Sequence, residues 1–242
     1  GKGSFQEVAL SEAAAWLAKG GRVALSYSLY RSSAELYLQA RQKTNDPAQA
    51  RQYLLTALRT LQSGNLPAEA LSMAEQGIGD LAADRETLFF LTQLARAAGR
   101  PDAADRYVRQ LLRLSLLRQL EQVRLAAAHG GALPQKVSLR TRGPQLPFDD
   151  KTYTLGYDVF LENRKLDDAW KVAASAVRQS PEDLAWRERL AKAAEWTGRP
   201  EMALDQWWHL ARETKRDDAW QAVLRLAPGL LNDGALIAAL QH

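Results

Sequence analysis

The 242-residue chain contains no cysteine, which excludes disulfide bonds, thiolate metal sites and cysteine nucleophiles. It also has no apolar run of about 18 residues, the length that a membrane-spanning helix needs. Residues branched at Cβ are few, whereas alanine and leucine are abundant. Because alanine and leucine lose little side-chain freedom in a helix, this composition favours helices over strands.

Dense basic clusters are absent as well. Lys and Arg total 32 against 28 for Asp and Glu, which leaves a formal net charge of +4. No run of five basic residues occurs, and most basic residues are arginines interleaved with acidic residues. We interpret this pattern as a solvated, ion-paired surface rather than a phosphate-binding one, and we expect no nucleic-acid partner.

Known catalytic and metal-binding patterns are missing. The three histidines, His129, His209 and His242, are far apart and have no neighbour at metal-ligand spacing. The sequence contains no HExxH or GxSxG motif and no glycine pattern of the Walker or Rossmann type. We therefore expect a protein that is not an enzyme and that binds neither a metal nor a cofactor.

What the sequence does contain is an internal repeat. Ala70 and Ala104 are 34 positions apart, and so are Ala169 and Ala203. Each of these alanines follows a short turn and lies near the start of the second helix of a predicted pair. The repeat divides much of the chain into four predicted units, at about 51–84, 85–118, 150–183 and 184–217.

The turns between the predicted helices use residues with a defined role. Gly99-Arg100-Pro101 and Gly198-Arg199-Pro200 are expected to end one helix with glycine and to begin the next with proline. Asp46-Pro47 predicts the start of a helix over about 47–62, and Ser180-Pro181 predicts an N-cap serine followed by a first helical proline. Three acidic pairs that could suggest catalysis are interpreted as helix-capping residues: Asp149-Asp150, Asp167-Asp168 and Asp217-Asp218.

The period and the residues within it resemble the tetratricopeptide repeat family. The unit at about 150–183 keeps most of the family pattern, in Tyr153, Gly156-Tyr157, Phe160, Ala169, Ala173 and Pro181. The resemblance implies an all-α fold, a tandem helix-turn-helix solenoid wound into a right-handed superhelix. In such solenoids neighbouring helix pairs stack to bury their apolar faces. The resemblance also implies a scaffold for protein–protein interaction.

The repeat is interrupted by residues 129–149, which hold three glycines and three prolines and cannot form a regular helix. The loop carries Lys136, Arg140 and Arg142, which are candidate contacts for a partner or ligand. An irregular insert that packs locally, or a hinge between two halves of the chain, would fit the same residues. The expected organisation is a cloning scar at 1–4, N-terminal helical repeats at 5–128, the loop at 129–149, and truncated C-terminal repeats at 150–242.

In the family, the first helix of each pair lines the concave side of the superhelix, which is the usual binding surface. Projecting the helical period outward predicts a mixed-charge binding face with one aromatic residue, made of Arg59, Phe89, Gln93, Arg96, Asp158, Glu188, Lys192 and Glu195. Six of the seven tryptophans lie in the C-terminal half, and we expect most of them in the core, with one or two exposed as anchors.

A narrower resemblance is to the periplasmic repeat regions of outer-membrane proteins that export exopolysaccharides such as Pel. Their repeats are similarly rich in Ala, Leu, Arg and Trp, with turns such as Gly198-Arg199-Pro200-Glu201-Met202. This resemblance implies a periplasmic scaffold, part of an outer-membrane protein, with membrane contact only through parts of the full-length protein outside this sequence. It would recruit a polysaccharide-modifying deacetylase or hydrolase and guide polymer to a porin, and contact of the repeats with the polysaccharide itself is a further expectation. The alternative is a generic adaptor or co-chaperone that binds peptide segments, for which a cytoplasmic location fits as well.

Overall fold

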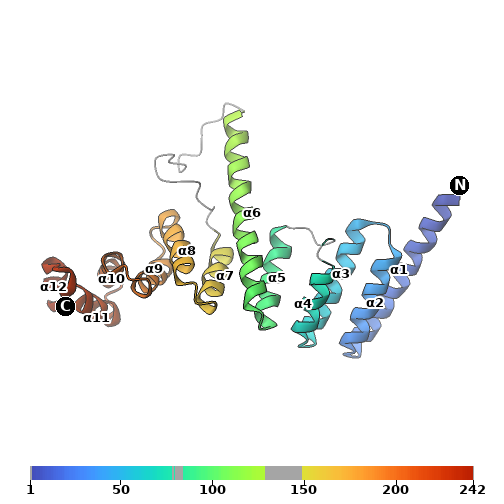
Figure 1. Ribbon diagram of the computed structural model, residues 1–242, viewed down its shortest axis with the longest axis horizontal. Helices are drawn as coiled ribbons and strands as arrows, with labels where there is room; N and C mark the ends of the chain where they lie inside the picture. Colours follow the sequence, from blue (N-terminus) through green and yellow to red (C-terminus); the bar gives the residue numbers. More distant parts are fainter. Residues whose placement is uncertain (1, 78, 80–83, 129–148, 242) are drawn as a thin grey trace. The chain divides into compact units, whose positions relative to one another are not determined.

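The computed structural model describes residues 2–77, 79, 84–128 and 149–241, and within these ranges the chain is helical with no strand (Figure 1). The described helices number twelve, with one short 3-10 helix, η1 (Pro228–Leu230). The all-α prediction is therefore confirmed. The predicted handedness of the superhelix stays a prediction.

The chain forms two compact units, Gly1–Leu111 and Leu112–His242, which divide inside one long helix, α6. Unit 1 contains α1 to α5 and the start of α6, with bounds α1 (Lys2–Ser26), α2 (Tyr30–Lys43), α3 (Pro47–Ser63), α4 (Pro67–Gln76), α5 (Arg85–Ala97) and α6 (Pro101–Ala128). Unit 2 contains the rest of α6 and six further helices, α7 (Asp150–Glu162), α8 (Leu166–Gln179), α9 (Leu184–Trp196), α10 (Pro200–Thr214), α11 (Asp217–Leu226) and α12 (Asp233–Leu240).

The helices form successive pairs, each joined by a short turn. The four repeat alanines, Ala70, Ala104, Ala169 and Ala203, all lie in second helices and are at most 2% exposed. A small side chain at this position lets the second helix approach its neighbours closely, and larger residues fill the gaps between helices. Residues that are 34 positions apart in the sequence therefore take equivalent packed positions in the structure.

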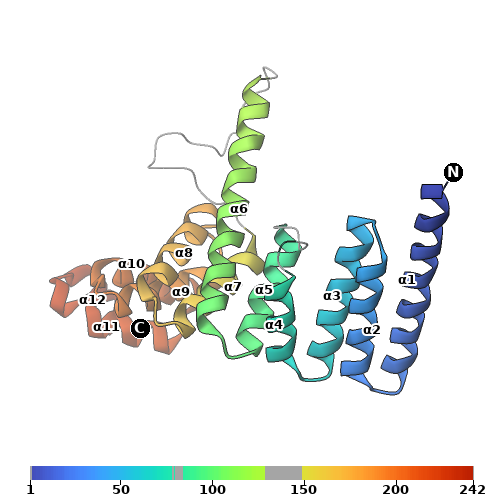
Figure 2. The same ribbon diagram turned by 45° about the vertical axis from the view of Figure 1, so that its right-hand side comes forward.

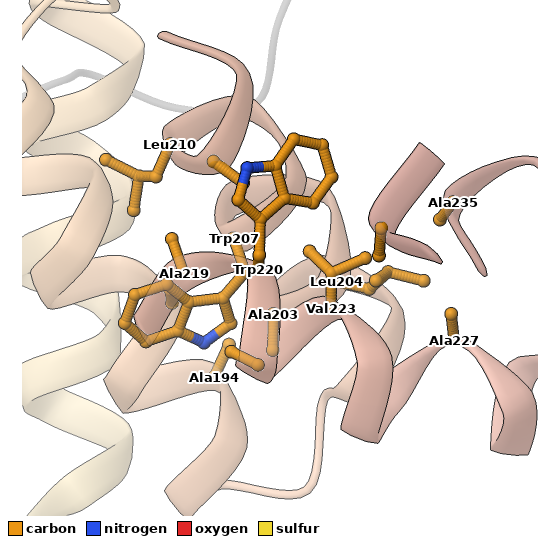
Figure 3. Packing of buried hydrophobic residues seen from close by; sticks show 14 residues of the cluster. Ala194, Ala203, Leu204, Trp207, Leu210, Ala219, Trp220, Val223, Ala227 and Ala235 are labelled. Atoms are coloured by element: carbon orange, nitrogen blue, oxygen red, sulfur yellow. The ribbon is translucent and has the colours of Figure 1, made fainter. Parts of the chain in front are cut away.

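The core of unit 2 shows how these small and large residues alternate (Figure 3). Alanines from α9, α10 and α11 lie between the rings of Trp207 and Trp220 and the side chains of Leu204, Leu210 and Val223. Trp186, Trp207 and Trp220 are at most 8% exposed, so three of the six tryptophans in the C-terminal half lie in the core, where most of the six were predicted, and Trp196 is exposed, as one or two were predicted to be. Trp170 and Trp208 are half-buried at the edge of this cluster.

The turns inside five of the pairs share one backbone feature. The second residue after each first helix has a positive φ, at 59° for Ser28, 57° for Asn65, 65° for Gly99, 56° for Arg164 and 68° for Gly198. This left-handed conformation reverses the chain and suits glycine best, because other residues bring Cβ too close to the following carbonyl. The two glycines were predicted to have this role, and the serine, asparagine and arginine take the same conformation at the equivalent sites.

One predicted helix start is wrong. Ser180 does not cap a helix that begins at Pro181, since α9 begins at Leu184 and Asp183 is its N-cap. The Asp183 carboxylate accepts hydrogen bonds from the backbone amides of Ala185 and Trp186, at 3.0 and 3.1 Å. A single oxygen that satisfies two amides makes the later start favourable, and Ser180 instead ends α8.

Other predicted helix starts are confirmed. Asp46 caps α3, whose first residue is Pro47, and Asp149 caps α7 by accepting from the amide of Thr152. The remaining acidic pairs lie in the first turns of α8 and α11, where carboxylates stabilise exposed amide donors. Across the described stretches, no helix is both long enough and apolar enough to span a membrane.

Candidate partner-binding face

The first helices of the pairs in unit 2 are α7, α9 and α11, and polar side chains connect them. Between α7 and α9, Arg189 Nη1 lies 3.3 Å from Thr154 Oγ1, and the indole nitrogen of Trp186 donates to Asp150 Oδ1 at 2.9 Å. Between α9 and the start of α11, Arg216 Nη1 lies 2.8 Å from Glu188 Oε2. Each first helix is thus held to the next by hydrogen bonds, in addition to the apolar packing beneath.

Glu188 and Glu195, two turns apart on α9, are the acidic centres of this arrangement. Glu188 binds Lys192 at 2.7 Å on its own helix as well as Arg216. These hydrogen bonds, from Arg216 and then Lys192, hold the pKa of Glu188 below its ordinary value. Glu188 is therefore a charged carboxylate with a cation on either side at neutral pH.

Glu195 has one cationic partner and one neutral partner. Its Oε2 lies 2.6 Å from Arg225 Nη1 of α11, and its Oε1 accepts a 2.6 Å hydrogen bond from the indole nitrogen of Trp207. Burial raises the pKa of Glu195, but the hydrogen bonds from Arg225 and Trp207 outweigh that effect and leave the pKa below its ordinary value. Trp207 is a core residue, only 6% exposed, so Glu195 connects the exposed Arg225 to the core through hydrogen bonds.

The cations of this surface are more exposed than the two glutamates that they bind. The side chains of Glu188 and Glu195 are 24% and 20% exposed, whereas those of Lys192, Arg216 and Arg225 are 47%, 44% and 58% exposed. Arg216 also pairs with Asp218 at the start of α11. Around the two glutamates, solvent or a partner therefore meets mainly ammonium and guanidinium groups, and at the start of α11 it also meets the Asp218 carboxylate, which is 58% exposed.

An exposed tryptophan lies beside these cations. Trp196, the last residue of α9, is 50% exposed and follows Lys192 by one helical turn, so the two side chains lie on neighbouring parts of one face. We refer to Glu188, Lys192, Glu195, Trp196, Arg216 and Arg225 as the α9–α11 face.

The α7 side of this surface is an aromatic cluster. The Trp186 ring meets the rings of Tyr153 and Tyr157 edge to face, each at 6.0 Å between centroids. Arg189 lies 4.4 Å from the centroid of the Trp186 ring. Burial raises the pKa of Tyr157 to about 12, so its hydroxyl stays protonated and donates to the Arg189 carbonyl. Asp158 is half-buried next to Tyr157 in the sequence of α7.

Comparison with known proteins adds information on the fold alone. No family model matches the sequence, and no curated protein matches it. The solved structure of MamA superposes with a TM-score of 0.52 at 14% identity, covering 84% of this chain and 93% of MamA. Together with the paired helices and the 34-residue packing period, this likeness decides the architecture. The chain has a tetratricopeptide-type repeat fold.

Two further solved structures are similar, but with TM-scores below 0.5. A tetratricopeptide repeat protein from Parabacteroides merdae gives a TM-score of 0.37 at 12% identity, covering 95% of this chain and 91% of that one. PilW, a type IV pilus biogenesis factor, gives a TM-score of 0.41 at 12% identity, covering 93% of this chain and 90% of PilW.

Within the tetratricopeptide-type fold, the predicted binding residues fall into separate groups. Glu188, Lys192 and Glu195 lie together on α9, and Asp158 lies on α7 of the same unit. In unit 1 the predicted residues lie on α3 and α5. Arg59 and Gln93 are exposed, whereas Phe89 and Arg96 are half-buried. Arg59 lies 5.7 Å from the ring centroid of Phe90, not of the predicted Phe89.

The loop candidates Lys136, Arg140 and Arg142 lie outside the described residues. Over the part of the chain that is described, no group of three or more His, Cys, Asp or Glu side chains is arranged to hold a metal ion.

Sequence reasoning missed three residues of the tetratricopeptide-type surface. Arg216 and Arg225 were not predicted. They follow Glu188 and Glu195 by 28 and 30 positions, which differ from the 34-residue period, so the repeat spacing gave no signal for them. One or two tryptophans were expected to be exposed, but Trp196 was not singled out, and its place at the end of α9 was the sign that it could be one of them.

Proposed function

We propose that this protein is a non-catalytic repeat scaffold that holds a protein partner on the α9–α11 face. The observation that carries the proposal is the exposed indole of Trp196 on a face whose cations are more exposed than the two glutamates they bind. Tryptophan and arginine are the side chains that most often supply binding energy at protein interfaces. Their shared place on two neighbouring helices favours a contact made by several repeats at once.

The charge of this face indicates the chemistry of the partner. Lys192 and Arg225 each use some of their donors on a glutamate and keep others directed to solvent, since a guanidinium has five N–H donors and an ammonium three. A partner carboxylate can bind these remaining donors without breaking the internal ion pairs. The expected partner surface carries acidic side chains around an apolar group that covers Trp196.

The other predicted residues supply further contact points in this proposal. Asp158 extends the surface towards α7. On unit 1 and on the loop, the candidates are Arg59, Phe89, Gln93, Arg96, Lys136, Arg140 and Arg142. A partner that reaches several of these groups would gain affinity from multiple weak contacts rather than from one pocket.

The finer form of the proposal rests on the resemblance to the periplasmic repeat region of PelB, the outer-membrane export protein for Pel exopolysaccharide. In that setting the partner is a periplasmic deacetylase or hydrolase that modifies the polysaccharide, and the scaffold holds it near the export pore. Polymer contact with the repeats is a further part of this form. The exposed cations of the α9–α11 face suit an enzyme with an acidic surface better than they suit a cationic, partly deacetylated polymer.

The alternative is a general adaptor that binds peptide segments, in the periplasm or in the cytoplasm. A repeat fold of this type fits that function equally well, and an extended acidic peptide could use the same cations. The two functions differ in what is bound: one folded enzyme, or many unrelated segments.

An affinity capture from envelope extract separates these possibilities. The wild-type protein is compared with Trp196→Ala and Arg225→Glu, and the retained proteins are identified by mass spectrometry. One carbohydrate-active enzyme that is retained by the wild type and lost with both variants supports the export scaffold. Many unrelated proteins support the adaptor, and identical capture by wild type and variants contradicts a role for this face.

A matched control uses the same unit. Leu240 of α12 is 70% exposed but lies outside the α9–α11 face. Leu240→Ala removes a comparable exposed apolar side chain and is expected to capture the same proteins as the wild type.

A further inference from the structure

Helix α1 has an outward face that carries exposed apolar side chains. It lies at one end of unit 1 and packs against α2 (Figure 2). Ala14 and Ala18 are buried on the α2 side, at 0% and 4% exposed. Trp16 and Val23 lie on the opposite side of the helix and Val8 lies on its flank, and these three residues are 70%, 51% and 55% exposed.

Two charged residues alternate with these apolar side chains along the same face. Glu12 and Lys19 are exposed and lie four residues before and three residues after Trp16, about one helical turn in each direction. Lys19 Nζ lies 5.2 Å from the centroid of the Trp16 ring. From the N-terminal end the face therefore reads Val8, Glu12, Trp16, Lys19, Val23. The acid precedes the tryptophan and the base follows it.

This order is self-complementary when the helix is turned end to end. The pairs Val8 with Val23 and Glu12 with Lys19 share one midpoint, which lies between Ala15 and Trp16. In an antiparallel pair of identical helices about a two-fold axis at that midpoint, valine meets valine and each glutamate meets a lysine. The large Trp16 ring meets the small Ala15 side chain, and its own copy lies just across the axis.

We propose that this face of α1 binds a second copy of the chain, with the two α1 helices antiparallel about a two-fold axis. Charge complementarity argues for this occupant: the arrangement creates two equivalent ion pairs between Glu12 of one copy and Lys19 of the other. A parallel arrangement would instead place each charged residue beside its own copy. The interface is isologous, as in most homodimers, and it closes without leading to a filament.

A single pair of helices makes a small interface. It falls at or below the lower end of stable interfaces, roughly 1,200 Å² of total buried surface, so the dimer is expected to be weak, with a dissociation constant in the micromolar range. Self-association through α1 is separate from the α9–α11 face, which lies in the other unit. Its test therefore does not depend on the proposed partner.

Sedimentation equilibrium of the whole chain tests the charge pairing. Glu12→Lys and Lys19→Glu each place like charges at both crossing points and are expected to weaken dimerisation by about 10-fold or more. The double variant restores opposite charges and is expected to return the dissociation constant close to that of the wild type. Glu182→Lys, a change of the same charge at an exposed residue before α9, is the control and is expected to leave the constant unchanged.

Cross-linking tests the orientation, and the absence of native cysteine makes it direct. With a short bismaleimide, Ala15→Cys is expected to link to itself, and a mixture of Val8→Cys with Val23→Cys is expected to link into a mixed dimer. Val8→Cys alone is expected to remain unlinked. Helical circular dichroism of every variant verifies folding.

Several results would overturn the proposal. One is a wild-type chain that stays monomeric up to about 0.5 mM, well above the micromolar range expected for a small interface. Charge reversals that leave dimerisation unchanged, or a double variant that dimerises more weakly than either single variant, would also contradict it. So would efficient cross-linking of Val8→Cys to itself.

Discussion

The indole nitrogen of Trp207 donates a 2.6 Å hydrogen bond to Glu195, which also pairs with Arg225 on the next first helix. Trp207 belongs to the core of unit 2, and Arg225 belongs to its surface. Glu195 therefore fixes the position of an exposed guanidinium relative to buried packing. A binding surface held in this way is preorganised, which reduces the entropy lost when a partner binds.

This relationship predicts a dependence of stability on pH. The pKa of Glu195 in the folded chain lies below its ordinary value of 4.5, so its contribution is complete above that pH and is lost as the pH falls through the folded pKa. We expect Glu195→Gln to lower the free energy of unfolding by about 1 kcal/mol at pH 7. The difference from wild type is expected to shrink steadily below pH 4.5. Urea unfolding over a pH series measures it, with Glu182→Gln as the control, and a difference that stays constant with pH would contradict this role.

Two tryptophans on α9 are expected to differ sharply in their importance for stability. Trp186 is fully buried, donates to Asp150 and contacts two tyrosine rings, so Trp186→Ala is expected to cost about 3–5 kcal/mol of unfolding free energy. Trp196 is half exposed, so Trp196→Ala is expected to change stability by no more than about 0.5 kcal/mol. Chemical denaturation compares the two variants, and a large loss for Trp196→Ala would place that ring in the core.

The adjacent glycines of α1 provide a second matched pair. A Cβ on Gly21 would lie 2.9 Å from the Tyr37 ring, whereas a Cβ on Gly20 would lie 3.5 Å from Leu36, an ordinary contact. Gly20→Ala is expected to stabilise the chain by up to about 1 kcal/mol through helix propensity. Gly21→Ala is expected to destabilise it by about 1–3 kcal/mol, because the buried ring must shift. Equal effects of the two substitutions in thermal unfolding would show that Tyr37 does not pack closely on Gly21.

The left-handed turn positions predict opposite effects for two substitutions. Arg164 has a φ of 56°, so Arg164→Gly is expected to stabilise unit 2 by about 0.5–1 kcal/mol. Gly198 has a φ of 68° with open space around it, so Gly198→Ala is expected to cost about 1 kcal/mol through backbone strain alone. Urea unfolding followed by circular dichroism measures both. Stabilisation by Gly198→Ala would contradict the equivalence of the turns.

The sequence carried much of the fold because its signals are local and repeated. Ala169 and Ala203 marked the second helices, and the glycine of Gly198-Arg199-Pro200 marked a turn whose conformation only a few residues adopt easily. The start of α9 was misplaced because Ser180 and Asp183 are both good N-cap residues. Which of them caps the helix depends on where the amides of Ala185 and Trp186 point in the folded chain.

The candidate site was less accessible to sequence reasoning. Helical periodicity placed Glu188 and Glu195 on an outward face, but it carried no information on which groups of the next helix would reach them. Arg216 and Arg225 were missed because their ion pairs depend on the register between α9 and α11. That register is set by the packing of residues such as Trp207 and Val223 underneath.

Photo-cross-linking in cells that make the protein tests whether a partner binds the α9–α11 face. A photoreactive amino acid replaces Lys192 on that face, or Asp205, an exposed residue of α10, as the matched control. We expect one discrete protein adduct from position 192 and none from position 205. An adduct from position 205 alone, or no adduct from position 192, would contradict it.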